Sequence, residues 1–212
     1  MGNVVIFDVD GTLADTKTGI ILALNDTLKE AGLKKIIPEK EDLFIGPPIK
    51  KSLMDQLHLE ENKAEMLTMR YRELYVSHCI EESVLYDGAI DVLQFLKEYD
   101  YIIGIATMKT KSQLDRLLDM FSLEKYFDII KTASESGKVT KKDMLRDIRV
   151  KLDDGYRKMY MVGDTRGDWK AAMTNDYCFI SADYGYGDMQ NIEGSHISRL
   201  NDMITLMKEN YS

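Results

Sequence analysis

Apolar side chains recur along the chain with two different periods, and these periods predict where strands and helices lie. Residues 4–7 form a short apolar run that the polar residues 8–11 close, which indicates a buried strand ending in a tight loop. From Thr18 to Gly32 apolar residues fall on one helical stripe, and the glycine is a suitable helix stop. A second helix is predicted over residues 60–77, where apolar side chains recur at spacings of three and four.

Beyond Gly88 the chain alternates predicted helices with short apolar strands, which is typical of a parallel α/β sheet. The helices are predicted over residues 89–99, 111–120 and 141–152, and the strands over residues 101–106, 127–130, 159–162 and 177–180. Because a lone strand is not stable, the first strand needs these later strands as partners. We therefore expect residues 1–14 and 84–212 to form an α/β core with a Rossmann-like parallel sheet, and residues 15–83 to form an inserted all-helical domain.

Composition limits the classes of function. Hydrophobic residues make up 44% of the 212 residues, an ordinary globular value, and the longest early apolar run is too short for a bilayer span or a signal peptide. We expect a cytoplasmic protein. The 28 basic and 36 acidic residues give a net charge of -8, which disfavours nucleic acid and anionic membranes as partners but admits a small anionic substrate. Monomer and homodimer both stay open.

The sulfur and imidazole groups point to no metal site. Two cysteines, Cys79 and Cys178, are too few and too far apart for a disulfide framework or a zinc site. Cys178 lies in a short apolar run, so we expect its thiol to be buried. The three histidines, His58, His78 and His196, have no ligand-like spacing. The candidate chemistry therefore depends on carboxylates.

Carboxylates follow two of the predicted strands directly. Asp8 and Asp10 lie at the end of the first strand, Asp164 follows the strand at 159–162, and Asp168 comes four residues later. In open α/β sheets, ligands bind at the carboxyl edge of the strands, so these side chains should meet there. Converging carboxylates repel one another unless a cation joins them, and oxygen ligands with room for phosphate fit Mg²⁺. The pattern predicts a magnesium site at this edge.

The first motif of the haloacid dehalogenase superfamily resembles the run Val4-Val5-Ile6-Phe7-Asp8-Val9-Asp10-Gly11-Thr12-Leu13. Three further segments match the family's later motifs in the right order, around Thr107, around Lys141 and from Val162 to Asp168. The motif order and the helical insertion are similar to the phosphoglycolate phosphatase-like subfamily, in which the insertion is a cap over the active site. The resemblance covers essentially the whole chain and implies a phosphatase.

The resemblance implies a role for each matching carboxylate. Asp8 would be the nucleophile that attacks the substrate phosphorus and forms an aspartyl-phosphate. Asp10 would protonate the leaving oxygen and later activate water, while its backbone carbonyl helps to ligate magnesium. Dehalogenase members lack this second Asp, so Asp10 together with Asp164 favours phosphate chemistry. Asp168 would be either a direct magnesium ligand or a residue that orients water or Lys141.

The resemblance also implies residues that bind the phosphoryl group. Thr107, in Ile105-Ala106-Thr107-Met108-Lys109, would hydrogen-bond the phosphoryl oxygens together with the neighbouring amide of Met108. Gly11 and Thr12 of the first motif would join them.

Three neighbouring lysines are candidates for the cation of the third motif: Lys138, Lys141 and Lys142. This cation balances charge on the phosphoryl group and the nucleophile. Lys141 is preferred, because Lys141-Lys142-Asp143-Met144-Leu145 resembles the family's Lys-x-Asp entry into a helix.

The run Ile45-Gly46-Pro47-Pro48-Ile49-Lys50-Lys51 is expected to be a loop, similar to a subfamily signature near the active-site mouth, where Lys50 would meet a substrate anion. Two other enzymes on the same core stay open: a phosphomutase, and a phosphonate hydrolase with Lys50 as its Schiff-base lysine. A phosphoacceptor switch also combines acids, Thr and Lys on a parallel sheet, but Asp10 and the large insertion argue against it. The substrate stays open among phosphoglycolate, a sugar phosphate, a nucleotide and pyrophosphate.

Overall fold

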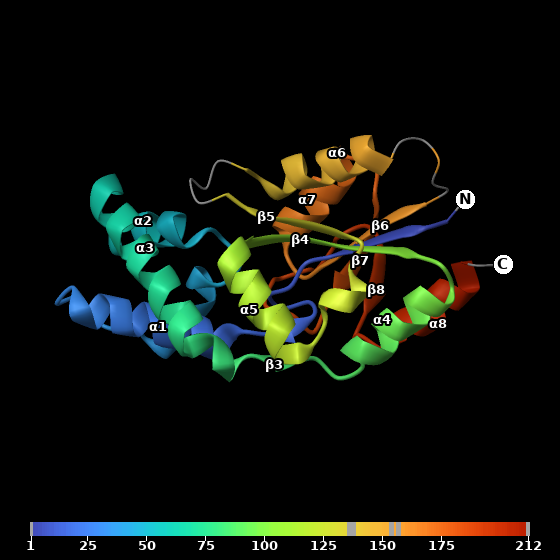
Figure 1. Cartoon of the computed structure of the whole chain (residues 1–212). Helices are drawn as coiled ribbons and strands as arrows, with labels where there is room; N and C mark the ends of the chain where they lie inside the picture. Colours follow the sequence, from blue (N-terminus) through green and yellow to red (C-terminus); the bar gives the residue numbers. More distant parts are fainter. Residues whose placement is uncertain (1, 135–138, 153–154, 156–157, 211–212) are drawn as a thin grey trace.

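A parallel sheet of six strands forms the centre of the computed structural model, which describes residues 2–134, 139–152, 155 and 158–210 (Figure 1). Its spatial order is β5-β4-β1-β6-β7-β8. The strands are β1 (Val4–Phe7), β4 (Ile102–Thr110), β5 (Ile129–Ala133), β6 (Met159–Gly163), β7 (Cys178–Ala182) and β8 (Ser195–Ile197). The first strand therefore lies between two strands that come more than 90 residues later in the chain, as its apolar sequence predicts.

Helices cover both faces of the sheet, which confirms the predicted α/β class. Along β1, Val5 and Phe7 belong to one hydrophobic cluster and Val4 and Ile6 to the other, because successive strand residues point to opposite faces. The first cluster is covered by α4 (Ala89–Glu98), α5 (Lys111–Phe121) and α8 (Asp202–Asn210). The second is covered by α6 (Lys141–Leu152) and α7 (Arg166–Thr174). A short 3-10 helix, η3 (Glu124–Tyr126), precedes β5.

A helical insertion lies at one end of the sheet, between two short strands (Figure 1). These strands, β2 (Ala14–Asp15) and β3 (Val84–Leu85), pair antiparallel and lie at the predicted boundary of the insertion. The insertion contains α1 (Lys17–Glu30), η1 (Pro38–Phe44), α2 (Ile49–Leu57), α3 (Glu61–Ser77) and η2 (Cys79–Glu82). The predicted limits of a separate domain, residues 15–83, stay a prediction.

The expected loop over residues 45–51 is wrong in its last three residues. Helix α2 begins at Ile49, directly after Pro48. Proline is compatible with the start of a helix, because the first backbone N–H groups have no partner within the helix. Leu53 is fully buried, and Ile49 and Met54 pack against the same core, so a helical apolar face was present behind the prolines.

Two local expectations near the sheet also differ from the structure. Strand β4 runs to Thr110 rather than ending at Ala106, so Thr107 lies inside the strand. Pairing with β5 carries the strand onward, through a register shift between Thr107 and Thr110. The thiol of Cys178 is exposed rather than buried, because this residue starts β7 two positions before β8 begins to pair with it.

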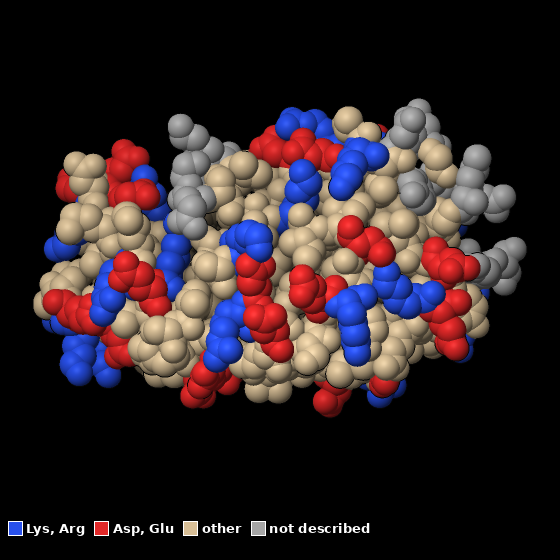
Figure 2. Space-filling view, in the orientation of Figure 1, with Lys and Arg blue, Asp and Glu red and all other residues tan. Residues whose placement is uncertain are grey.

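The surface carries both charges closely mixed on the face that Figure 2 shows. Ion pairs such as Lys97 with Asp128, at 2.7 Å, and Arg116 with Glu81, at 2.8 Å, join them. None of the described helices is long and apolar enough to cross a membrane.

Ile103 on β4 packs in the hydrophobic cluster that α4, α5 and α8 cover, so truncating this side chain should destabilise the fold. Ile103→Ala should lower the free energy of unfolding by about 2–5 kcal/mol, because Ile103 is 0% exposed and the loss leaves a cavity. Urea denaturation measures this change. The matched control is Ile130→Ala on β5, where the side chain is 40% exposed and the loss should be clearly smaller. Equal losses in the two variants would contradict the described core.

Candidate active site

A pocket of about 460 Å³ opens between the carboxyl edge of the sheet and the helical insertion. Its sheet side is lined by Asp8, Asp10, Met108, Lys109 and Lys141. Its insertion side is lined mainly by α1, α2, α3 and the segment before α2. The pocket therefore lies where the strand-end carboxylates were expected to gather, and the insertion forms its opposite wall.

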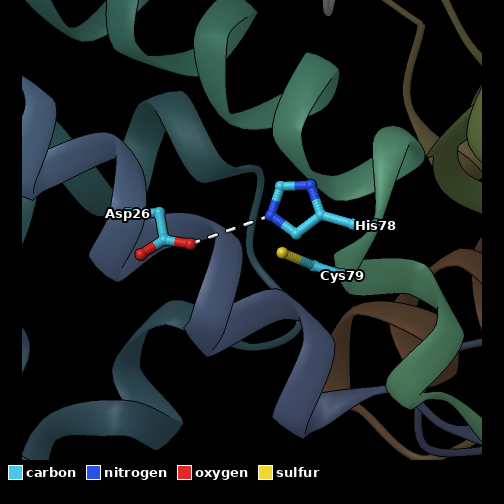
Figure 3. A group of neighbouring side chains, drawn as sticks. All are labelled: Asp26, His78 and Cys79. Atoms are coloured by element: carbon cyan, nitrogen blue, oxygen red, sulfur yellow. Dashed lines mark ion pairs between the residues drawn. The ribbon is translucent and has the colours of Figure 1, made fainter.

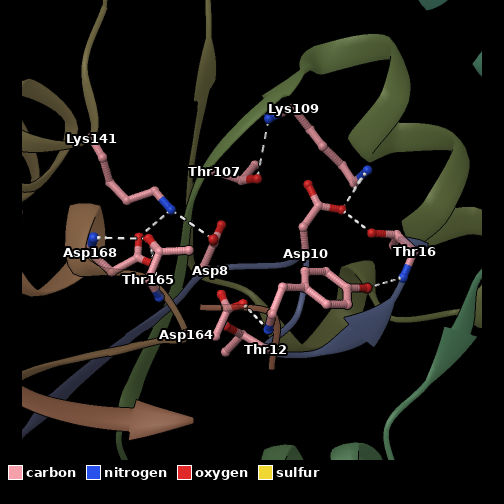
Figure 4. A network of polar contacts seen from close by, with 11 residues as sticks. Asp8, Asp10, Thr12, Thr16, Thr107, Lys109, Lys141, Asp164, Thr165 and Asp168 are labelled. Carbon is pink, nitrogen blue, oxygen red and sulfur yellow. Dashed lines mark hydrogen bonds and ion pairs between the residues drawn. The ribbon is translucent and has the colours of Figure 1, made fainter. Parts of the chain in front are cut away.

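Three carboxylates converge beside this pocket (Figure 4). Asp8 follows β1, Asp164 follows the neighbouring β6, and Asp168 lies in the first turn of α7; one oxygen of each lies within 4.8 Å of the others. Lys141, the first residue of α6, contacts two of them: its Nζ lies 2.7 Å from Oδ2 of Asp8 and also binds Oδ1 of Asp168. The strand order thus brings four of the predicted residues together.

Burial dominates the electrostatics of this group. Desolvation raises the pKa of Asp8 well above its usual range; Lys141 opposes the rise, while Asp168 and Asp10 add to it. Burial, with Asp8 and Asp168 nearby, raises the pKa of Asp164 to about 8. Burial alone would lower the pKa of Lys141, but Asp168 and Asp8 outweigh it, so this pKa is raised. Without a further cation, the acidic group therefore keeps protons near neutral pH.

The first motif holds Asp164 in place. Gly11 has a φ of 72°, and a Cβ on it would lie 2.1 Å from Oδ2 of Asp164, so only glycine fits this turn. Thr12 donates a hydrogen bond from Oγ1 to Oδ1 of Asp164 at 3.3 Å, and the amide of Tyr186 donates to Oδ2 at 2.8 Å. Among the described residues, Gly11 and Thr12 thus contact this carboxylate and do not line the pocket.

Asp168 has hydrogen-bond donors on both carboxylate oxygens. Its Oδ2 accepts from the amide of Thr165 at 3.0 Å and from Oγ1 of Thr165 at 2.7 Å, in a capping box that starts α7. Its Oδ1 accepts from Lys141. This arrangement suits a residue that orients Lys141, the second of the two roles predicted for it.

The remaining oxygens fit a hard cation such as Mg²⁺. Oδ1 of Asp8 is buried and has no hydrogen-bond partner among the described residues. A buried oxygen of this kind is costly unless a cation or another donor meets it. Asp8 and Asp164 offer carboxylate oxygens, which are donors that magnesium prefers. The family resemblance adds the backbone carbonyl of Asp10 to this donor set.

Asp10 lies on the other side of the site and turns toward two residues that the sequence analysis did not select. Its Oδ1 is 2.8 Å from Nζ of Lys109 and also accepts from Oγ1 of Thr16 (Figure 4). Thr107 is fully buried, and its Oγ1 accepts from the amide of Lys109 at 3.2 Å. The available signal for Lys109 was a basic residue close behind the apolar run 101–106, two positions after Thr107.

The other predicted residues are placed as follows. Met108 lines the pocket, Lys142 is exposed, and Lys138 lies outside the described residues. Lys50 lines the pocket, but its Nζ lies 3.0 Å from Glu61 and 2.7 Å from Glu65.

A second group of neighbouring polar side chains, Asp26, His78 and Cys79, lies in the insertion where α1 meets the end of α3 (Figure 3). The sequence pattern does not reveal this group, because Asp26 is far from the other two residues along the chain. His78 and Asp26 form an ion pair at 3.8 Å in which both side chains are about half exposed, so it contributes little. Burial raises the pKa of Cys79, which fits a packed thiol.

Comparison with known proteins places this fold and site in context. A family profile described as haloacid dehalogenase-like hydrolase matches residues 5–181. The chain is 28% identical over 211 residues to a phosphoglycolate phosphatase of Aquifex aeolicus, with 96% of each chain covered. It is 30% identical over 186 residues to the tyrosine-protein kinase PtkA of Mycobacterium tuberculosis, which covers 86% of this chain and 62% of that protein.

A crystal structure of a predicted phosphatase from Clostridium acetobutylicum matches with a TM-score of 0.89 at 28% identity, over 99% of both chains. The family profile and the phosphatase relatives define the class of protein, a phosphoric monoester hydrolase. The chain belongs to the haloacid dehalogenase-like hydrolase family, because the family profile spans most of its length. The resemblance drawn from its motifs is therefore confirmed.

The raised pKa values predict how stability depends on pH when no metal is bound. From about pH 5 to pH 7 the unfolded chain has already released the protons that folded Asp8 and Asp164 retain, so the free energy of unfolding should fall as pH rises, by up to about 1.4 kcal/mol per pH unit for each group. The fall should level off above about pH 8. Urea denaturation in EDTA measures this slope. Magnesium should make it shallower.

The variant Asp164→Asn separates the contribution of Asp164 to the pH dependence of stability from the contributions of other titrating groups. Its free energy of unfolding should change less steeply over the same pH range, and magnesium should stabilise it less than the wild type. The matched control is Asp119→Asn, at an exposed helix position, which should keep the wild-type slope. Identical slopes in all three proteins would show that Asp164 does not carry the effect.

Proposed function

We propose that this protein is a magnesium-dependent phosphatase that hydrolyses a small phosphate monoester through an aspartyl-phosphate on Asp8. The observation that carries the proposal is the state of the Asp8 carboxylate: Lys141 binds Oδ2, while buried Oδ1 lacks a hydrogen-bond partner among the described residues. One oxygen is thus oriented by a fixed cation, and the other has a free acceptor position that a metal ion would fill. A purely structural carboxylate would have both oxygens satisfied.

The proposed reaction has two displacements. First, an oxygen of Asp8 forms a bond to phosphorus while the bond to the leaving oxygen breaks, and Asp10 gives its proton to that oxygen. Second, water gives a proton to Asp10 and attacks phosphorus, which releases inorganic phosphate and restores the Asp8 carboxylate. Thr107 and the amide of Met108 are proposed to hydrogen-bond the phosphoryl oxygens.

The cations of the site balance charge during both steps. Lys141 stays protonated and offsets negative charge on the phosphoryl group, while Asp168 keeps it in place. Asp8, Asp164 and the backbone carbonyl of Asp10 would hold a magnesium ion, which would supply the remaining positive charge.

The insertion side of the pocket supports a choice among the substrates. Apolar Ile20, Phe44, Ile49 and Met54 line it. Its basic side chains already have acidic neighbours: Lys50 binds Glu61 and Glu65, and Lys51 lies 2.6 Å from Asp55. The pKa of Glu65 is lowered mainly by Lys50 and further by Arg72. We propose that the leaving group is a sizeable metabolite portion with apolar surface, rather than a small one with a second strong negative charge.

The nucleophile is tested by Asp8→Asn, which should lower kcat for p-nitrophenyl phosphate at least about 10³-fold, because an amide cannot form the acyl-phosphate bond. The fold should remain, since Asn has nearly the same shape, and circular dichroism checks this. Asp119→Asn is the matched control and should keep wild-type activity. EDTA should abolish wild-type turnover and magnesium restore it. Turnover by Asp8→Asn near the wild-type rate would exclude the mechanism.

The substrate preference is tested by a panel of phosphorylated metabolites with and without magnesium. Nucleoside monophosphates and larger sugar phosphates should give a higher kcat/KM than phosphoglycolate, because the pocket of about 460 Å³ offers apolar contacts and its lysines are already paired. Phosphate release measures the rates. A clear preference for phosphoglycolate would contradict the proposed leaving group while leaving the phosphatase assignment intact.

A further inference from the structure

Lys109 is a buried charge for which the proposed reaction has given no role. It lies near the end of β4, and its side chain is only 3% exposed. Removing an ammonium group from water is unfavourable unless other groups meet it. Two groups do: Oδ1 of Asp10 at 2.8 Å and the hydroxyl of Tyr75 at 2.9 Å. The burial of this charge is therefore matched by two specific contacts in the pocket wall.

The contact with Asp10 selects one of its two oxygens. Lys109 and Thr16 both bind Oδ1, and Oδ2 takes part in neither contact (Figure 4). Two donors on the same oxygen restrict rotation of the carboxylate group. The structure thus distinguishes a held oxygen from one that remains available to a ligand in the pocket, which Asp10 lines.

The contact with Tyr75 joins this arrangement to the helical insertion. Tyr75 belongs to α3 and is fully buried, and its ring also lies under the Lys109 ammonium, with 4.5 Å from Nζ to the ring centroid. Tyr71, one turn earlier on α3, stacks on it and lines the pocket. Lys109 therefore connects a core strand, a helix of the insertion and the carboxylate of Asp10.

The geometry points to Lys109 as a positioning residue that holds Oδ1 of Asp10 so that Oδ2 faces the leaving oxygen, with Tyr75 keeping the ammonium in place. This inference rests on the proposed function, in which Asp10 protonates the leaving group. Lys109 itself exchanges no proton and forms no bond with the substrate. The orientation of Asp10 then depends on the position of α3, so the acid and the insertion act together.

Two phosphate esters of similar size separate this role from substrate binding. The leaving group of p-nitrophenyl phosphate departs with little help from an acid, whereas the alcohol of benzyl phosphate needs a proton. With Lys109→Met, kcat for benzyl phosphate should fall about 100-fold and kcat for p-nitrophenyl phosphate less than about 5-fold, with KM nearly unchanged. Lys111→Met, at a side chain that is 78% exposed, is the matched control and should match the wild type with both esters.

Two further variants test whether Lys109 acts through Asp10. In an Asp10→Asn background, Lys109→Met should cause little additional loss with benzyl phosphate, because the group that it positions is already gone. Tyr75→Phe keeps the ring and removes the hydroxyl, so it should show the same selective loss at a smaller size. This variant carries the test where circular dichroism shows that Lys109→Met does not fold.

Each other result overturns the inference. Equal loss with both esters, additive loss in the double variant, a raised KM at unchanged kcat, or faster turnover by Lys109→Met would each show that Lys109 does not position the acid. In these cases the wild type still hydrolyses the esters and the proposed function stands. A wild type that releases no phosphate from either ester with magnesium present would overturn the proposed function, and this inference with it.

Discussion

Mutual repulsion among buried carboxylates is the constraint on which the site and much of the core depend. Asp8, Asp164 and Asp168 lie within 4.8 Å of one another and are shielded from water. Charges so close in a medium of low dielectric constant are tolerated only where a cation or a proton lies among them. Lys141 supplies the cation that the chain carries itself, and a magnesium ion would offset the remaining negative charge in the proposed function.

Distant parts of the chain must meet at this edge for the carboxylates and their cation to come together. β1 must lie beside β6 for Asp8 to reach Asp164, and α6 must start at the same edge for Lys141 to reach both Asp8 and Asp168. The hydrophobic clusters on the two faces of the sheet fix those positions. The apolar core therefore holds together polar groups that would separate in water.

The sequence was sufficient where structure follows from local pattern. Helix α6 covers its predicted residues, 141–152, because amphipathic spacing and its first lysine are both local signals. The sequence was insufficient where a residue acts through a distant partner. Lys109 meets Tyr75, and the hydroxyl of Tyr186 accepts from the amide of Thr16 at 2.6 Å, across 170 positions. Such pairs depend on tertiary packing. No local pattern in the sequence marks which distant residues will meet. The start of α2 was not predicted, because the two prolines before it indicate a loop and the apolar residues that follow them form only a short helical pattern.

The short ribbon of β2 and β3 has a consequence for how such a chain can change over evolution. Because Ala14 pairs with Leu85 and Asp15 with Val84, the chain leaves the core and returns to it at one place. The segment between these strands is therefore a loop whose ends lie side by side. Lengthening such a loop adds little to the entropy cost of folding the core. The helices between them can therefore be reshaped as a module, which alters the wall that selects the substrate, while Asp8, Asp164 and Asp168 stay in place because core elements hold them.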